Sequence, residues 1–207
     1  GLLPESMAAS KLYGVELDSI SGRIAQQLYP KANITIRGFE KSGFPDGFFD
    51  LAIGNVPFGN YSLADRRYDK EHLLIHDYFF AKTIDKVRAG GVIAFVTSNG
   101  ISGGTMDKKD RRAREYIARR CDLLGAVRLP SNASLANAGT EAGMDIVFLQ
   151  KRDMPRSLDE PLPEWTEVDT VEEHTYTGGD GREKRGFLTM NRYFQAHQSM
   201  ALGNLEI

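Results

Sequence analysis

Short apolar segments alternate with helical patterns over the first 150 residues, and this alternation constrains the fold more than any other feature of the chain. Residues 11–17 (KLYGVEL), 49–53 (FDLAI) and 91–97 (GVIAFVT) have the length and the apolar content of strands that are buried on both faces. Between them, apolar residues recur every three or four positions, as they do in helices that pack against a sheet. Strands that alternate with helices favour an α/β fold with a mostly parallel sheet covered by helices.

Start and stop signals divide this alternation into elements. Asp18 or Ser19 can cap a helix that Pro30 ends, and Gly90 with Gly91 is expected to stop a second helix. The other predicted elements are strands over 33–39, 123–129 and 145–150 and a polar helix over 108–120. No helix separates the last two strands, so we expect a doubly wound sheet that ends in a C-terminal antiparallel hairpin.

The composition changes at Asp153, where the chain becomes acidic. Residues 1–152 contain 21 Lys and Arg against 17 Asp and Glu, whereas residues 153–185 contain 4 against 10. Pro155, Pro161 and Pro163 follow the change, and such prolines are typical of loops and domain edges. We therefore predict one domain over residues 1–152, followed over 153–207 by an acidic, proline-containing linker and a C-terminal appendage.

Composition also excludes several classes of protein. No stretch approaches the roughly 20 apolar residues that a membrane span needs, and no charged-then-apolar leader opens the sequence. We therefore expect no membrane partner. The single cysteine, Cys121, has no partner for an internal disulfide and cannot form a thiolate cluster for zinc. We expect Cys121 in the core and a cytoplasmic protein.

Two clusters of polar side chains have competing explanations. His72 and His76 are four residues apart on a predicted helix, which suits a metal pair, but no third ligand with suitable spacing follows, so we expect no metal. A basic run can face a nucleic-acid backbone, or it can be a solvated helix face in which Asp107, Asp110 and Glu115 are interleaved. Its members are Lys108, Lys109, Arg111, Arg112, Arg114, Arg119 and Arg120.

Ligands of doubly wound sheets bind at the carboxyl ends of the strands, and three such ends carry residues of interest. Glu16 ends the first strand just before a helix, and one carboxylate offers two oxygens that can accept both hydroxyls of a ribose. A solvent-exposed acid at a strand end is the alternative explanation. Phe39 and Glu40 follow the next strand, and residues 55–58 follow the third.

The sequence Asn55-Val56-Pro57-Phe58 suits recognition of a planar exocyclic amine. The Asn55 side-chain oxygen can accept one amine hydrogen and the Val56 carbonyl the other, which turns the nitrogen lone pair toward an electrophile. Pro57 fixes φ and stiffens the turn. Phe58 offers a face on which a base can stack, a contact worth roughly 1–3 kcal/mol. A strand-to-loop turn with a buried phenylalanine is the alternative explanation.

This tetrapeptide is similar to the catalytic Asn-Pro-Pro-Tyr/Phe of amino-methyltransferases. Together with the VELD sequence at 15–18 and the DIVFLQK sequence at 145–151, it gives residues 1–152 a resemblance to N6-adenine DNA methyltransferases. The chain is especially similar to the methylase segment of very large helicase–methylase proteins of mobile elements. The resemblance implies a Rossmann-like sheet, S-adenosylmethionine as the cofactor, and DNA with a target adenine flipped out of the stack.

The resemblance also assigns cofactor-binding residues by position. Glu16 should bind the cofactor ribose, with Leu17 beside it in the cofactor site. Phe39 or Glu40 should lie near the cofactor adenine. The family often has an aspartate followed by an aromatic residue at this point, whereas here the aromatic residue comes first.

The catalytic residues implied in the same way are Asn55, Val56, Pro57 and Phe58. Asn55 and the Val56 carbonyl should hold the target N6 amine, and Phe58 should stack on the target base. Val56 stands where the family has its first proline, and the change is tolerable because the role belongs to the backbone carbonyl. The reaction requires no metal and no covalent intermediate.

The glycine-rich loop of this family belongs to a strand that precedes the Glu16 strand, and only ten residues precede Lys11. We therefore expect an N-terminally truncated fragment that is inactive alone and belongs to a larger restriction-modification or mobile-element protein, whose other parts could include a helicase. Enzymes that methylate RNA guanine amines or protein glutamine amides use similar tetrapeptides, so these substrates are alternatives. A non-catalytic, methylase-like scaffold that binds DNA for a helicase is the remaining alternative.

Overall fold

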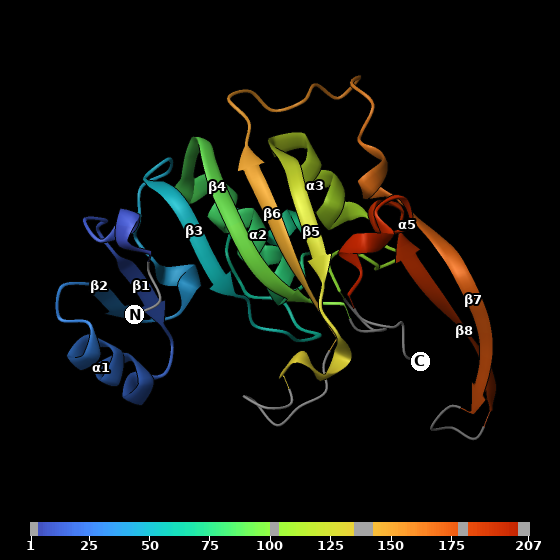
Figure 1. The fold of residues 1–207 in the computed structure, drawn as a ribbon, viewed down its shortest axis with the longest axis horizontal. Coiled ribbons are helices and arrows are strands. Elements are labelled where there is room, and N and C mark those ends of the chain that lie inside the picture. The colour runs from blue at the N-terminus through green and yellow to red at the C-terminus, as the bar shows by residue number, and fades with distance from the viewer. Residues whose placement is uncertain (1–3, 100–103, 135–142, 178–181, 203–207) are drawn as a thin grey trace. The chain divides into compact units, whose positions relative to one another are not determined.

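The computed structural model describes residues 4–99, 104–134, 143–177 and 182–202. The chain forms two compact units, Gly1–Phe44 and Pro45–Ile207, and each is described by itself. Figure 1 labels the strands and most of the helices of both units. Short 3₁₀ helices occur at Glu5–Met7, Phe39–Lys41, Asp69–Glu71, Ser131–Ser134, Glu164–Thr166 and Gln198–Met200.

The first unit is one strand–helix–strand motif. Strand β1 (Tyr13–Glu16) pairs in parallel with β2 (Asn33–Ile36), and helix α1 (Ser19–Leu28) connects them. The Asp18 carboxylate caps the helix by accepting a hydrogen bond from the Ser21 N–H at 2.7 Å, as the sequence predicts. Gly22 is buried against β2, and a Cβ at this position would lie 2.7 Å from the Ile36 side chain. The helix therefore packs on β2 through a close approach that only glycine allows.

The apolar row of α1 is not buried. Ile20, Ile24 and Leu28 recur at a spacing of four residues, yet they are 60%, 54% and 66% exposed. The side of α1 that meets β2 is instead formed by the small residue Gly22 and by Gln26, whose side chain donates to the Ile34 carbonyl at 2.9 Å. The periodicity thus predicts the helix correctly but not the side that is covered.

The second unit is built on a four-stranded mixed sheet with the order β3-β4-β6-β5. Its strands are β3 (Phe49–Asn55), β4 (Val87–Ser98), β5 (Cys121–Arg128) and β6 (Met144–Lys151). Strands β3 and β4 are parallel, and β6 is antiparallel to both β4 and β5. The expected antiparallel pairing of the last two predicted strands is confirmed, and β6 lies between β4 and β5.

Two helices lie behind this sheet in the view of Figure 1, α2 (Ile75–Lys86) and α3 (Arg112–Arg120). The predicted end of α2 at Gly90 is wrong, because the helix ends at Lys86 and β4 begins at the next residue. Gly90, at φ +71°, lies inside β4 where the pairing with β3 shifts register, and not at a helix end. Helix α3 is shorter than the predicted 108–120. The core between helices and sheet contains Phe80, Ile84, Ile93, Phe95, Ile117 and Leu149.

The C-terminal part of the second unit adds a two-stranded antiparallel sheet and a short helix. Strand β7 (Val168–Thr177) pairs with β8 (Glu183–Asn191), and α5 (Arg192–Ala196) follows directly. Trp165 and Phe194 are 8% and 1% exposed and belong to the same core as the four-stranded sheet. Residues after 152 therefore pack on the main sheet, while the domain boundary at residue 152 stays a prediction.

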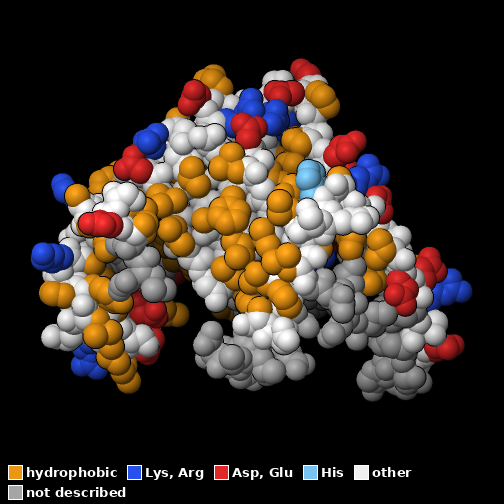
Figure 2. All heavy atoms as spheres, viewed as in Figure 1, with side chains coloured by type: hydrophobic (Ala, Val, Ile, Leu, Met, Phe, Trp, Pro, Cys, Tyr) orange, Lys and Arg blue, Asp and Glu red, His pale blue; other side chains and the backbone are white. Residues whose placement is uncertain are grey.

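The opposite face of the four-stranded sheet carries exposed apolar side chains. Figure 2 shows hydrophobic side chains gathered over the middle of the face that Figure 1 presents to the viewer. Ile53, Leu124 and Phe148, which belong to β3, β5 and β6, are 68%, 56% and 36% exposed. In the part of the chain that the structure describes, no helix is long and apolar enough to cross a membrane.

Candidate functional site

Asn55, Val56, Pro57 and Phe58 lie together at the carboxyl end of β3. Asn55 is the last residue of the strand, is paired with Val96 of β4, and has an exposed side chain. The Val56 N–H donates to the Val96 carbonyl at 3.0 Å, and the Val56 side chain is only 3% exposed in the core. Phe58 is 39% exposed. The structure thus anchors the turn through Val56 and presents Asn55 and Phe58 outward.

A second exposed aromatic residue stands beside this turn. Tyr61 is 53% exposed, and its ring lies across Gly59, where a Cβ would come within 2.5 Å of a ring carbon. The Tyr61 carbonyl accepts a hydrogen bond from the Ile75 N–H, at the start of α2, at 2.9 Å. The sequence reasoning did not single out Tyr61, although its position three residues after Phe58 was the available signal.

Strand β4 ends beside β3, at the same edge of the sheet. Asn99 directly follows β4, and its N–H donates to the Gly143 carbonyl at 3.0 Å. The Asn99 side-chain amide donates to an Asp145 carboxylate oxygen at 3.3 Å. The chain segment after β4 is therefore tied to the start of β6.

A buried charge cluster supports this edge of the sheet. Arg128 donates to both carboxylate oxygens of Asp145 at 2.9 and 3.0 Å, and its Nη2 lies 2.7 Å from an Asp107 oxygen. The guanidinium also stacks 4.2 Å from the Phe194 ring centroid. Burial raises the pKa of Asp107 to about 6, although the Arg128 charge opposes the shift. Asp107 accepts from the Asn191 N–H at 2.9 Å, so the cluster also holds the end of β8.

A second buried chain of hydrogen bonds runs from β4 to α2. The Thr97 and Thr105 hydroxyls are 3.2 Å apart, and the Thr105 hydroxyl donates to the Asp77 carboxylate at 3.0 Å. Burial raises the pKa of Asp77, against the effect of the neighbouring His76. Arg114 donates to the Thr105 carbonyl at 3.0 Å, so α3 also restrains this segment. These contacts join residues distant in sequence, and the sequence analysis did not find them.

The predicted cofactor residues lie in the first unit. Glu16 ends β1, is half-buried, and accepts a hydrogen bond from the Asp18 N–H on Oε1 at 2.8 Å. Leu17 is 76% exposed. Phe39 and Glu40 do not end a strand as predicted, because β2 stops at Ile36 and both residues lie in a 3₁₀ helix. Since β1 and β2 are parallel neighbours, these residues follow the same edge of the two-stranded sheet as Glu16.

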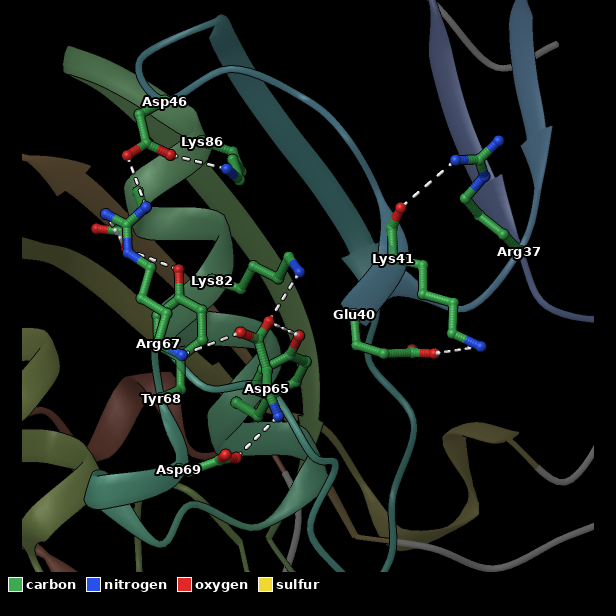
Figure 3. Close-up of polar contacts among 12 residues, drawn as sticks. Arg37, Glu40, Lys41, Asp46, Asp65, Arg67, Tyr68, Asp69, Lys82 and Lys86 are labelled. Carbon is green, nitrogen blue, oxygen red and sulfur yellow. Dashed lines mark hydrogen bonds and ion pairs between the residues drawn. The ribbon is translucent and has the colours of Figure 1, made fainter.

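The Glu40 side chain folds back toward its own backbone. A Cβ at Gly38 would lie 2.3 Å from both Glu40 carboxylate oxygens, so the carboxylate lies directly over Gly38. Lys41 is 3.9 Å from the same carboxylate, and Figure 3 shows this pair together with Arg37, which donates to the Lys41 carbonyl at 3.5 Å. The Glu40 carboxylate therefore lies against the chain just after β2, and its place in a cofactor site stays a prediction.

The basic run is mostly occupied by contacts within the protein. Arg111 pairs with Glu115 and Glu167, Arg112 pairs with Asp110, and Arg114 is 1% exposed. Arg119 donates to the Ser157 carbonyl at 2.7 Å, and Arg120 lies 3.7 Å from the centroid of the Tyr116 ring. The arginines between positions 111 and 120 therefore contact neighbouring residues of the same segment, Thr105 or residues 157–167, and they do not form an open phosphate-binding row.

The histidine pair is not arranged on one helix. His72 precedes α2 and has a left-handed backbone with φ 49°, whereas His76 lies inside the helix and is 2% exposed. The expectation that both belong to one helix is therefore wrong. Within the described ranges of the chain, no group of three or more His, Cys, Asp or Glu residues is arranged to hold a metal ion.

Comparison with known proteins gives one sequence relative and several structural neighbours. No protein family model matches the chain. The chain is similar to Defense against restriction protein B of Escherichia phage P1, with 35% identity over 153 residues, which make up 72% of this chain and 6% of that protein.

Among solved structures, the chain is similar to a class I S-adenosylmethionine-dependent methyltransferase of Listeria monocytogenes, with a TM-score of 0.55 and 19% identity. That match covers 74% of this chain and 47% of the other. A chain from a type I restriction–modification system matches with a TM-score of 0.53 and 16% identity, over 70% of this chain and 31% of the other.

These similarities establish the fold class. The chain has the Rossmann-like α/β fold of S-adenosylmethionine-dependent methyltransferases, as the sequence predicts. The chain spans 6% of the phage protein and less than half of each of these two solved structures.

Proposed function

We propose that this chain carries the methyl-transfer site of an S-adenosylmethionine-dependent DNA methyltransferase that modifies the N6 amine of adenine. The observation that carries the proposal is the arrangement of residues 55–58. An exposed asparagine ends β3, the next residue is anchored in the sheet by its N–H, and a partly exposed phenylalanine follows. This combination suits the capture of a flat base that bears an amine.

Each residue of the tetrapeptide has a separate task in this proposal. The Asn55 side-chain oxygen accepts one hydrogen of the amine, and the Val56 carbonyl accepts the other. Val56 can keep its carbonyl in place because its side chain is buried and its N–H is bonded to Val96. Pro57 limits the freedom of the turn, and Phe58 stacks on the flipped base. Most of the rate acceleration then comes from orientation of the amine.

The first unit offers donors and acceptors that fit the cofactor. S-adenosylmethionine, when bound, supplies an electrophilic methyl group. The Asp18 N–H holds the Glu16 carboxylate through Oε1, so the second oxygen can accept a ribose hydroxyl. Leu17, Phe39 and Glu40 complete the proposed cofactor-binding set at the same edge of the two-stranded sheet.

The proposed setting is a larger protein of a restriction-modification system or mobile element. Support comes from the phage protein, which is named for defense against restriction, and from the chain of the type I restriction–modification system. DNA contacts outside the target base are expected from elsewhere than the arginines at positions 111–120, which bind within the chain. We also propose that the larger polypeptide includes a helicase.

The test is methyl transfer from labelled S-adenosylmethionine by the full-length protein. DNA, RNA and a protein mixture are offered in parallel, and the modified base is identified by mass spectrometry after digestion. We expect N6-methyladenine in DNA. We expect Asn55→Ala to lower kcat by about 100-fold or more, the scale seen when one positioned catalytic hydrogen bond is removed.

The matched control is Asn132→Ala, which removes the same side chain from an exposed position on a short 3₁₀ helix. This variant should keep wild-type turnover. Label in RNA guanine or protein glutamine instead of DNA would replace the proposed substrate. Wild-type turnover by Asn55→Ala would remove the catalytic assignment, and a wild-type protein that binds DNA without methylating any substrate would indicate the scaffold alternative.

A further inference from the structure

The segment that follows the tetrapeptide is held to α2 by a set of partly buried polar contacts. Residues 59–74, here called the post-motif loop, connect the tetrapeptide to α2, and their only regular element is the 3₁₀ helix Asp69–Glu71. Loops longer than about 12–15 residues are uncommon in compact domains and are usually functional. A loop of this kind needs specific contacts to keep one conformation.

Asp65 is the centre of these contacts. Its Oδ2 accepts hydrogen bonds from the Tyr78 hydroxyl at 2.8 Å and from the Lys82 ammonium at 3.0 Å. Tyr78 and Lys82 are one turn apart on α2, so one carboxylate oxygen binds two side chains of the same helix face. The Asp65 and Lys82 side chains are 16% and 6% exposed. Figure 3 shows Asp65 reaching from the loop toward Lys82.

The same residue also organises the loop itself. The Asp65 carbonyl accepts from the Tyr68 and Asp69 N–H groups at 2.8 and 2.9 Å. Its Oδ1 accepts from the Arg67 N–H at 3.2 Å, and its own N–H donates to the Asp69 carboxylate at 2.8 Å. The side chain thus stabilises a turn within the loop and attaches that turn to the helix.

A second attachment lies next to the first. The Tyr68 ring is 4% exposed and packs edge-on against the Tyr78 ring, with centroids 5.5 Å apart. Its hydroxyl donates to the Asp85 carboxylate at 2.6 Å. Arg67 reaches the same carboxylate at 2.8 Å and Asp46 at 2.7 Å, as Figure 3 shows for the latter pair. The loop is therefore fastened along most of the length of α2.

Charge at Asp65 persists at neutral pH. Burial raises the pKa of its carboxyl group, but the hydrogen bonds from Lys82 and Tyr78 outweigh burial and leave the pKa below its usual value. A buried ion pair is a weak source of stability compared with apolar packing. Its directional bonds do, however, select one arrangement of the groups that it joins. This arrangement includes the loop segment between Phe58 and Asp65.

We propose that Asp65 is a positioning residue that, through Lys82 and Tyr78, holds the post-motif loop so that Phe58 and Tyr61 stay presented beside Asn55. Asp65 does not touch the base in this proposal. It acts on Phe58 and Tyr61 through the backbone of the loop. The start of the loop is also tied to the start of α2 by the hydrogen bond from the Ile75 N–H to the Tyr61 carbonyl. The catalytic consequence rests on the proposed methyl-transfer function.

The first test measures the loop without reference to activity. Amide hydrogen exchange is followed in the full-length wild-type protein, in Asp65→Asn and in Lys82→Met. We expect exchange at the Tyr68, Asp69 and Ile75 N–H groups, which donate to the Asp65 and Tyr61 carbonyls, to accelerate by about tenfold or more in both variants, while the strands of the sheet keep their protection. Asp50→Asn is the matched control, because it breaks the exposed pair between Asp50 on β3 and Arg88 on β4 without touching the loop.

The second test separates positioning from stability. We expect Asp65→Asn and Lys82→Met each to lower kcat about tenfold or more with little change in the KM for S-adenosylmethionine, since small misplacements of reacting groups have large effects on rate. The double variant should be no worse than either single variant. Lys82→Arg, which keeps a cationic donor, should recover part of the loss.

The outcomes distinguish the two proposals. If the wild-type protein methylates no substrate, the proposed function fails, and the exchange data alone decide whether Asp65 positions the loop. Unchanged exchange at the Tyr68, Asp69 and Ile75 N–H groups would overturn the positioning role. Two other results would also overturn the positioning role. Exchange could accelerate uniformly over the second unit, or kcat could fall only in proportion to the unfolded fraction. In either case Asp65 would be a general stabilising residue.

Discussion

Arg128 and Asp145 face each other across β5 and β6 as a bidentate ion pair in which the side chains are 2% and 0% exposed. The two residues are directly opposite in the strand register, at the end of the β5–β6 pair that lies nearest the connection between these strands. Asp145 also accepts from the Asn99 amide, which ties the end of β4 to the same carboxylate. One buried carboxylate thus fixes three neighbouring chain segments at the edge of the sheet that carries Asn55.

Removal of Asp145 should therefore destabilise the second unit strongly. Asp145→Ala leaves the Arg128 charge buried with Asp107 as its remaining acidic partner, and we expect a loss of about 3–5 kcal/mol in the free energy of unfolding. Chemical denaturation measures the loss. Asp50→Ala, which breaks the exposed pair with Arg88, should cost under about 1 kcal/mol. Equal effects in the two variants would contradict the importance of burial.

The stability of the protein should contain a pH-dependent contribution from Asp107. Its native pKa is about 6 against an ordinary value of 3.8, so the native state holds a proton that the unfolded state has already lost between these pH values. This contribution is most favourable below pH 4, declines as pH rises to 6, and is absent above that range. The full decline is up to about 3 kcal/mol, at 1.36 kcal/mol per pKa unit.

The measurement compares the wild-type protein with Asp107→Asn from pH 4 to pH 7. The variant cannot titrate at this position, so its unfolding free energy should decrease less than that of the wild type over the same range. Parallel curves for the two proteins would show that the Asp107 carboxyl titrates near its ordinary pKa.

Cys121 should not react in the native protein. Its side chain is fully buried, and burial raises the pKa of the thiol to about 12. At pH 7 the thiolate fraction is then about one part in 10⁵, and only the thiolate is nucleophilic. A disulfide reagent such as dithionitrobenzoate should label Cys121 only when the protein unfolds. Stoichiometric labelling within minutes under native conditions would contradict the burial of this residue.

Glu16 should affect binding of the cofactor more than binding of DNA. In the full-length protein, Glu16→Gln keeps an acceptor for the Asp18 N–H but removes the charge that strengthens a bond to a hydroxyl. We expect about a tenfold weaker affinity for S-adenosylmethionine by calorimetry, which corresponds to about 1.4 kcal/mol. Glu5→Gln, at an exposed position in the same unit, is the control. An unchanged affinity would mean that Glu16 is only an acid at the end of a strand.

The parts of the fold that were predictable depend on local patterns. The apolar run 91–97 could be recognised as a strand because its residues are covered from more than one side, and the Asp18 cap because it acts within three residues. The end of α2 was not predictable in this way. Gly90 is as compatible with a bend inside a strand as with a helix end, and the pairing of β4 with β3 decides between them.

The candidate site was predictable where its chemistry is contiguous in sequence. Residues 55–58 form a motif that can be recognised alone, whereas the contact between Asp65 and Lys82 joins residues 17 positions apart. The arginines of the basic run show the same limit. Arg114 and Arg119 are occupied by backbone carbonyls more than 35 residues away, and nothing in their local sequence shows that these partners exist.

The position of β6 between β4 and β5 has a consequence for synthesis of the chain on the ribosome. Strand β5 emerges before β6, yet β6 is its neighbour in the four-stranded sheet. At roughly 5–20 residues per second, the apolar segment Cys121–Arg128 waits about 1–6 seconds for Met144–Lys151 to follow it. During this interval both β4 and β5 have an open edge that can pair with another chain. Arrival of β6 closes the facing edges of β4 and β5 at once, and β5 then keeps only its outer edge as the last strand of the four-stranded sheet.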